Sequence, residues 1–245
     1  MSPKTTIARL QEMKRQGQKI VAVVVYDYQM AKIVDRAGVD IVSIGDSVGV
    51  NMWGHDAESD VTVEQMLLAC KAVTRGVARA LVSCDVPGSV EDVVAGARTL
   101  AVDGGAAMVK IEADANTVRA VVDAGVPVWA QLRGSAEVGS KEEVAGVVRQ
   151  ALALEGAGAS LIDFRHSGPV AGAAVAQALS IPVIGGLGGG PWLDGRVRAI
   201  VNAIGYTAAA LEDNADRYAN VARVALDAIS AYAEDVRGGR QIRGK

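Results

Sequence analysis

One unit recurs along the whole sequence: a helical pattern of apolar residues, a glycine, and a short run of β-branched or small apolar residues. Short runs without polar alternation are typical of parallel strands that are buried on both faces. We expect strands at residues 20–25, 41–44, 81–84, 108–111, 128–131, 160–164 and 182–185, and a weaker eighth at 203–206. These alternations predict one (β/α)8 TIM barrel domain over residues 1–245, with an extra helix at each end. A doubly wound open sheet is the alternative, but a GxGxxG turn is missing after the first strand.

Capping residues indicate where the intervening helices begin and end. Ser89 with Asp92, and Ser140 with Glu143, have the spacing of a capping box. Glycines that would end a helix in the left-handed conformation follow four of the helical patterns, at Gly38, Gly105, Gly125 and Gly158. The last helix is expected over residues 214–236, and its apolar stripe should dock on the barrel or on another subunit.

Composition narrows the range of partners. The formal charge of -3 provides no basic field for nucleic acid. The charged N-terminal stretch has no continuous apolar run, so we expect neither a secretory signal nor a membrane span. Cys70 and Cys84 fall in a helical pattern and in a strand, which indicates buried thiols in a reducing compartment. The expected location is the cytoplasm.

Polar residues follow most of the predicted strands at their C-terminal ends, where TIM barrels carry their active sites. They are Asp27, Asp46, Ser47, Asp85, Lys110, Glu112, Gln131, Asp163, Arg165 and His166. Alternate residues of a strand share a face, so Lys110 lies on the same side as Glu112, and Asp163 on the same side as Arg165.

Three of these strand ends carry acids that could share one cation. Asp46, Asp85 and Glu112 provide oxygen ligands, and no Cys or His cluster lies near them in the sequence. Such a set favours Mg²⁺ or a similar hard divalent cation over zinc. Lys110 could instead be a Schiff-base nucleophile, but neighbouring acids would favour its protonated form.

Several strings resemble those of the ketopantoate hydroxymethyltransferase family. YDY, GDS, GHD and VKIE are specific in combination, and CDVP, VPVWAQL and SIPVIGGLGGG extend the similarity over nearly the whole chain. The resemblance implies a TIM barrel of the phosphoenolpyruvate/pyruvate-binding type, usually assembled as a decamer. It also implies an enzyme that uses magnesium to hold a 2-oxo acid, whose enolate attacks the methylene group of methylenetetrahydrofolate.

The resemblance also implies roles for individual residues. Asp46 and Asp85 would bind the metal, and Glu112 would hold the ion or its water. Ser47 and Lys110 would bind the carboxylate and the keto oxygen of the substrate.

The sequence departs from the family where the family's base and lid are expected. Gln131 stands in place of a histidine, the long glycine-rich segment after it is missing, and Arg165 falls where the family has a glutamate base. Arginine cannot act as a base at physiological pH. Asp163 and His166 are the candidate replacements, and Arg165 is suited to a second carboxylate or a phosphate unless it only pairs with Asp163.

Three functions therefore stay open. The first is a magnesium-dependent enzyme that forms or breaks a carbon–carbon bond beside a 2-oxo acid, with a changed base and partner substrate. The second is a lyase, hydrolase or mutase of the isocitrate lyase and phosphonopyruvate group. The third is a non-catalytic binding or assembly protein, against which four retained buried charges argue. In each case we expect a small-molecule 2-oxo acid ligand and a homo-oligomer.

Overall fold

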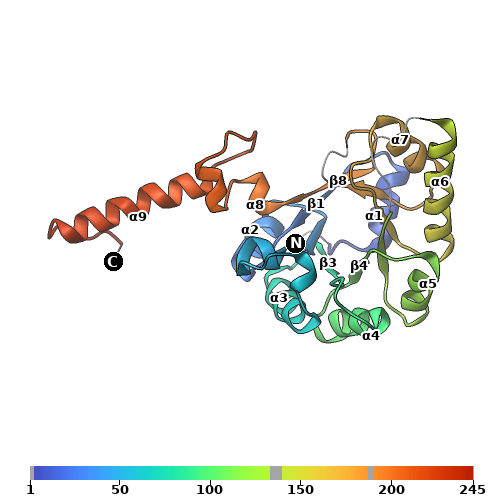
Figure 1. The fold of residues 1–245 in the computed structure, drawn as a ribbon, viewed down its shortest axis with the longest axis horizontal. Helices are drawn as coiled ribbons and strands as arrows, with labels where there is room; N and C mark the ends of the chain where they lie inside the picture. The colour runs from blue at the N-terminus through green and yellow to red at the C-terminus, as the bar shows by residue number, and fades with distance from the viewer. Residues whose placement is uncertain (1–2, 133–139, 187–189, 245) are drawn as a thin grey trace. The chain divides into compact units, whose positions relative to one another are not determined.

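A closed barrel of parallel strands forms the core of the computed structural model, which describes residues 3–132, 140–186 and 190–244 (Figure 1). The strands pair in chain order, and they are β1 (Ile20–Val24), β2 (Ile41–Ile44), β3 (Leu81–Asp85), β4 (Met108–Ile111), β5 (Val128–Gln131), β6 (Leu161–Asp163), β7 (Val183–Gly185) and β8 (Gly195–Ala199). The predicted TIM barrel is confirmed, and so are seven of the predicted strands to within one or two residues at their ends.

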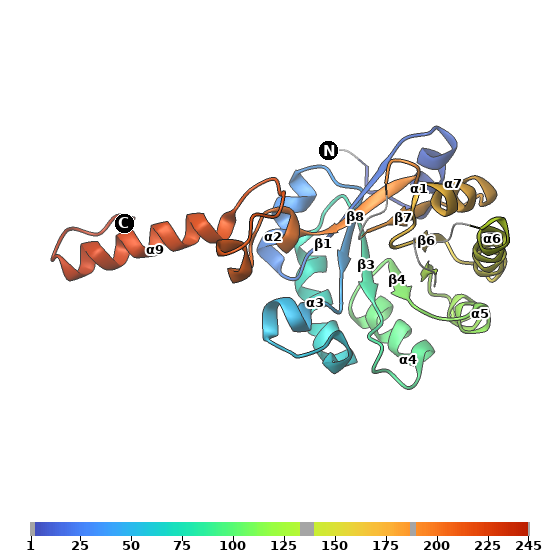
Figure 2. The same ribbon diagram turned by 45° about the horizontal axis from the view of Figure 1, so that its top comes forward.

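Helices connect the strands and surround them, as Figures 1 and 2 show for α3 to α7. They are α1 (Ile7–Arg15), α2 (Tyr28–Arg36), α3 (Val63–Gly76), α4 (Val93–Arg98), α5 (Ala115–Asp123), α6 (Lys141–Gly156) and α7 (Pro169–Ala178). Short helical turns η1 (Gly49–Trp53) and η2 (Glu58–Asp60) lie between β2 and α3, and η3 (Thr99–Asp103) continues α4.

The eighth strand lies earlier than predicted. β8 spans Gly195–Ala199, whereas residues 203–206 form the end of a helix and a turn around Gly205, whose φ is 61°. Arginines alternate with small and apolar residues in GRVRA, so β8 is not an apolar run like the others. Its backbone packs closely on β1, because a Cβ atom on Gly195 would lie 2.2 Å from the carbonyl oxygen of Ile20.

Two of the capping predictions have different outcomes. The Ser140 and Glu143 capping box at α6 is confirmed. The Ser89 cap is wrong, because the Ser89 hydroxyl donates to the carbonyl of Val61 at 2.6 Å and α4 begins after Asp92, whose carboxylate accepts from the backbone N–H of Ala95. The four predicted glycines all have positive φ, as expected for residues that end a helix, namely Gly38, Gly105, Gly125 and Gly158.

An apolar layer fills the N-terminal end of the barrel. It combines side chains from the starts of the strands, including Ile20, Ile41 and Trp129, with Leu10 and Met13 from α1. Because side chains alternate along a strand, the residues two positions further along also face the barrel interior. The polar residues at the strand ends therefore lie directly next to this layer, toward the C-terminal end of the barrel.

The chain divides into two compact units, Met1–Arg198 and Ala199–Lys245. The second unit contains α8 (Ile200–Ala203), η4 (Ala208–Leu211) and α9 (Val221–Arg237). α9 begins later than the predicted residue 214 because Asn220 caps it, accepting from the backbone N–H of Arg223 at 3.0 Å. Val224 and Ile229 on this helix are exposed. A single domain and a docked last helix stay predictions.

Within the described parts of the chain, every helix is too short or too polar to cross a membrane.

Candidate active site

Polar side chains replace the apolar layer at the C-terminal end of the barrel. Asp85, Lys110, Gln131 and Asp163 each stand one or two strand repeats after a residue of the apolar layer, on the same inward face. The strand register places Asp85 beside Lys110 and Gln131 beside Asp163. The alternation predicted from the sequence thus brings these residues together.

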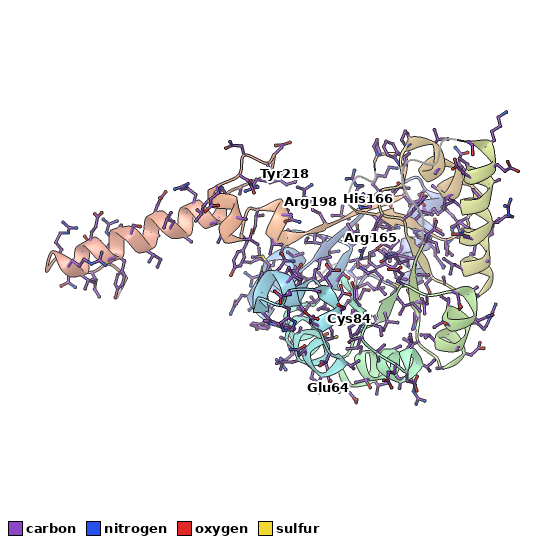
Figure 3. All side chains as sticks on the ribbon, viewed as in Figure 1. Glu64, Cys84, Arg165, His166, Arg198 and Tyr218 are labelled. Atoms are coloured by element: carbon purple, nitrogen blue, oxygen red, sulfur yellow. The ribbon has the colours of Figure 1, made fainter. Side chains whose placement is uncertain are left out.

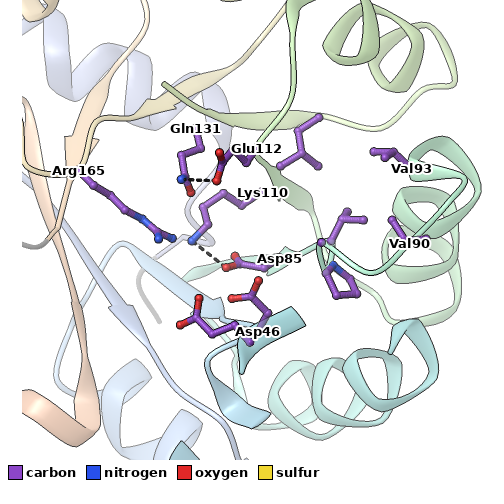
Figure 4. A pocket seen from close by; sticks show the side chains of 13 residues that line it. Asp46, Asp85, Val90, Val93, Lys110, Glu112, Gln131 and Arg165 are labelled. Carbon is purple, nitrogen blue, oxygen red and sulfur yellow. Dashed lines mark hydrogen bonds and ion pairs between the residues drawn. The ribbon is translucent and has the colours of Figure 1, made fainter. Parts of the chain in front are cut away.

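Asp85, Lys110 and Gln131 line a cavity of about 190 Å³ (Figure 4). One side of its lining is polar and includes Asp46, Glu58, Asp85, Lys110, Glu112, Gln131 and Arg165. The other side is largely apolar and comes from the β3–α4 segment, α4 and β4, with Val86, Pro87, Gly88, Val90, Val93 and Ile111. A ligand with an anionic or keto end and a small aliphatic end would match this division.

Lys110 lies at the centre of the polar side. Its Nζ atom is 2.8 Å from Oδ2 of Asp85 and 3.8 Å from Oδ2 of Asp163, and it lies over the Trp129 ring at 5.7 Å. Burial by itself lowers the pKa of Lys110, but the two carboxylates outweigh burial, so the pKa ends above its ordinary value. The lysine is therefore a cation, which argues against its action as a Schiff-base nucleophile.

The pKa of Asp85, the other member of this ion pair, is shifted in favour of the neutral carboxyl. Burial raises its pKa from 3.8 to about 6, although Lys110 acts in the opposite direction. The two shifts are compatible, because Lys110 faces two carboxylates while Asp85 loses its hydration and also faces Asp46. Burial and the nearby Glu58 raise the pKa of Asp46 in the same way.

Arg165 reaches the cavity from the segment that follows β6. Its Nε atom donates to Oδ2 of Asp163 at 3.1 Å, and its side chain is 32% exposed, whereas that of Asp163 is completely buried. Figure 4 shows the guanidinium group directed into the cavity toward Lys110 and Asp85. Burial lowers the pKa of Arg165, but Asp163 and Asp85 outweigh burial and raise it, so the guanidinium is charged.

Gln131 and Glu112 form a second pair in the lining. The side-chain amide of Gln131 donates to Oε2 of Glu112 at 2.9 Å, as Figure 4 shows. Glutamine therefore occupies the predicted position in the site. It holds a carboxylate there but, as an amide, offers no group that titrates near neutral pH.

Ser47 is not part of the cavity lining but follows Asp46, which is, and it is held by two residues that the sequence did not identify as part of the site. Its Oγ atom lies 2.9 Å from the hydroxyl of Tyr26, and Asn51 donates to that same hydroxyl at 3.2 Å and to the Ser47 carbonyl at 2.8 Å. Tyr26 is buried, and burial raises its pKa above 10.0 against the effect of both hydrogen bonds. Tyr26 belongs to the YDY string, which was the one sequence signal available.

The two candidate bases, Asp163 and His166, are not among the described residues that line this cavity. Asp163 is completely buried, and its Oδ1 has no hydrogen-bond partner in the described part of the chain. His166 is exposed in the β6–α7 segment, where its φ of 51° is unusual for a residue other than glycine (Figure 3). Glu58 does line the cavity. It was missed because it belongs to η2 and not to a strand end.

The site has hard oxygen donors of the kind that Mg²⁺ prefers. Asp46 and Asp85 both line the cavity, and Oδ1 of Asp85 is buried without a hydrogen-bond partner among the described residues. Within residues 3–132, 140–186 and 190–244, no group of three or more His, Cys, Asp or Glu side chains is placed so that it could hold a metal ion. Mg²⁺ usually keeps several waters and takes one or two protein carboxylates, so the donors fit this ion.

The sequence matches the profile described as "Ketopantoate hydroxymethyltransferase" over residues 4–241. Two similar curated proteins are named 3-methyl-2-oxobutanoate hydroxymethyltransferase. The protein from Alkalilimnicola ehrlichii is 36% identical, over 96% of this chain and 91% of its own. The one from Heliobacterium modesticaldum is 34% identical, over 98% and 93%.

Solved structures with the same fold are more distant in sequence. Oxaloacetate acetylhydrolase in complex with the product oxalate has a TM-score of 0.66 and 13% identity, over 97% of this chain and 88% of its own. Phosphonopyruvate hydrolase in complex with oxalate and Mg²⁺ has a TM-score of 0.65 and 15% identity, over 96% and 88%. At this identity the likeness concerns the fold alone.

Proposed function

The chain belongs to the ketopantoate hydroxymethyltransferase family, and we propose that it forms or breaks a carbon–carbon bond beside the carbonyl group of a 2-oxo acid. The observation that supports this most is the pairing of a charged, buried Lys110 with Asp85 in a cavity that Asp46 also lines. An ammonium group in a water-poor site can stabilise the negative charge that develops on a keto oxygen as an enolate forms.

Asp46 and Asp85 are the residues that would hold Mg²⁺, with Glu112 on the ion or on a water. When bound, the cation would supply Lewis-acid polarisation of the keto group. Ser47 would then donate to the substrate carboxylate from the position in which Tyr26 and Asn51 hold it. The apolar residues Val90 and Val93 leave room for a small aliphatic side chain.

The resemblance implies that the proton acceptor is the part of the site that differs from the family. Arg165 is charged and cannot be the base, and it donates to Oδ2 of Asp163, whose Oδ1 has no hydrogen-bond partner among the described residues. Glu58 joins Asp163 and His166 as a candidate, because it is a carboxylate of the cavity lining. The methylene donor also stays open, and methylenetetrahydrofolate is one of the donors to test.

Proton exchange tests the proposal directly. The protein would be incubated with Mg²⁺ in deuterated water with 3-methyl-2-oxobutanoate, pyruvate or 2-oxopentanoate, and NMR would follow exchange at C3. We expect exchange that stops when EDTA removes the ion and that falls by about a hundredfold or more in Asp85→Ala. The variants Glu58→Gln, Asp163→Asn and His166→Asn then identify the base. Absence of exchange with all three acids would contradict the proposal.

A lyase reaction on the same class of oxo acid is the second candidate. It is favoured by Arg165, a cation in the cavity where the family resemblance implies a base. Release of an aldehyde or a second acid from a branched 2-oxo acid would distinguish cleavage from transfer. A non-catalytic protein would show binding of the oxo acid without exchange.

A further inference from the structure

The contact with Asp163 involves only the edge of the Arg165 guanidinium group that carries Nε. That hydrogen bond is made through Nε, at 3.1 Å. The end of the guanidinium group that carries Nη1 and Nη2 points into the cavity (Figure 4), and the side chain is 32% exposed. Two parallel N–H groups in one plane match the two oxygens of a carboxylate.

The described lining of the cavity has more acidic than basic side chains, so an anionic group of a ligand would need to contact one of the cations. Asp46, Glu58, Asp85 and Glu112 are acidic, and Lys110 and Arg165 are the cations of the described lining. Lys110 is already within 2.8 Å of Asp85. In this lining an anionic group is attracted chiefly to the cations, and Arg165 offers it a matching pair of N–H donors.

We infer that Arg165 binds a second carboxylate in the reacting pair, in addition to the carboxylate of the 2-oxo acid. This inference rests on the proposed function and specifies its substrate class. The second carboxylate could belong to the 2-oxo acid itself, which is then a dicarboxylic acid, or to an aldehyde that accepts the enolate.

The reaction with a carboxylate-bearing aldehyde is balanced without an oxidant or reductant. The C3 proton of the oxo acid passes to a base, and C3 forms a bond to the aldehyde carbon. The electron pair of the aldehyde C=O bond moves to its oxygen, which takes up a proton and becomes a hydroxyl group. Glyoxylate is the smallest probe of this class.

The competing explanation is that Arg165 serves only as the counter-ion of the buried Asp163. Arg165→Lys separates the two roles, because lysine keeps the positive charge but lacks the planar pair of donors. Arg165→Gln removes the charge as well. Arg149→Gln on the exposed surface of α6 is the matched control.

Two pairs of probes test the inference and distinguish the sources. In the first arm, titration calorimetry with Mg²⁺ compares 2-oxoglutarate with 2-oxopentanoate, which have the same carbon chain but differ by one carboxylate. In the second arm, NMR compares glyoxylate with acetaldehyde as acceptors for 3-methyl-2-oxobutanoate. We expect a preference of about tenfold or more for the extra carboxylate in one arm. That preference should disappear in Arg165→Lys and Arg165→Gln and persist in Arg149→Gln.

The result that overturns the inference is a wild-type protein without preference in either arm, or a preference that Arg165→Lys retains. If 2-oxopentanoate still undergoes C3 exchange in that case, the proposed function stands and the inference alone fails. If all the oxo acids fail to bind and to exchange, both fail. Thermal unfolding of each variant verifies that it is folded.

Discussion

The ammonium nitrogen of Lys110 lies 2.8 Å from Oδ2 of Asp85, and both side chains are almost completely buried. Buried ion pairs lose hydration on both partners, and the mutual attraction does not always restore that loss. In this pair the loss of hydration has a large effect on Asp85, whose pKa rises to about 6. The site therefore holds a lysine whose pKa is raised and a carboxyl whose pKa is raised to about 6.

Lys110→Met should destabilise the protein more at pH 8 than at pH 5. The substitution leaves Asp85 and Asp163 buried without their shared cation, which should cost about 3–5 kcal/mol when both are ionised. At the lower pH, protonation of Asp85 removes part of that penalty. Urea denaturation at the two pH values measures the difference, and Lys71→Met on the exposed face of α3 is the control. Equal losses at both pH values would contradict this prediction.

The contribution of Asp85 to the stability of the wild-type protein should fall as pH rises from about 4 to about 6. The pKa of Asp85 is higher in the fold than the ordinary 3.8, so in this window the folded state binds more protons than the unfolded chain. Its contribution to stability is present below pH 3.8, is lost as pH rises through 6, and is on the order of 3 kcal/mol. Asp85→Asn should flatten this part of the profile. An unchanged slope in the variant would assign the titration to other groups.

Tyr26→Phe should weaken substrate binding more than it slows the chemical step. The variant loses the hydroxyl that lies 2.9 Å from Ser47 Oγ, and we expect about 1 kcal/mol lower stability and a several-fold higher KM. Ser47→Ala should have a similar effect, and the double variant should be less than additive because the two residues act together. Tyr218→Phe, at a tyrosine that is 91% exposed, should leave both measurements unchanged. Additive effects of Tyr26 and Ser47 would exclude a positioning role.

Two glycine substitutions should change stability in opposite directions. Gly195→Ala places a Cβ atom 2.2 Å from the Ile20 carbonyl oxygen at the closure of the barrel and should cost about 1–3 kcal/mol or more. Gly146→Ala lies inside α6, where the nearest described side-chain atom to the added Cβ atom is 3.8 Å away, and should stabilise by about 0.5–1 kcal/mol. Chemical denaturation measures both variants. A neutral Gly195→Ala would show that β8 and β1 separate more easily than their packing indicates.

Local patterns were sufficient for most of the barrel but not for its last strand. β2, β4 and β5 are mostly apolar, with one polar residue each, and each is found at its predicted residues. β8 contains two arginines and was missed, because its pairing depends on closure between the first and last strands. Similarly, the Ser89 hydroxyl bonds to Val61, which is distant in sequence, and so it does not cap a helix.

The sequence by itself determined the type of fold, the family, and several of the polar residues that line the cavity, among them Asp46, Asp85 and Lys110. These depend on strand periodicity and on short motifs, which are local properties of the chain. Only the tertiary structure decided that Arg165 pairs with Asp163 through Nε, that Gln131 holds Glu112, and that Tyr26 supports Ser47. It also decided the charge states of Lys110 and Asp85, because a pKa depends on burial and on distances between charges that different strands supply.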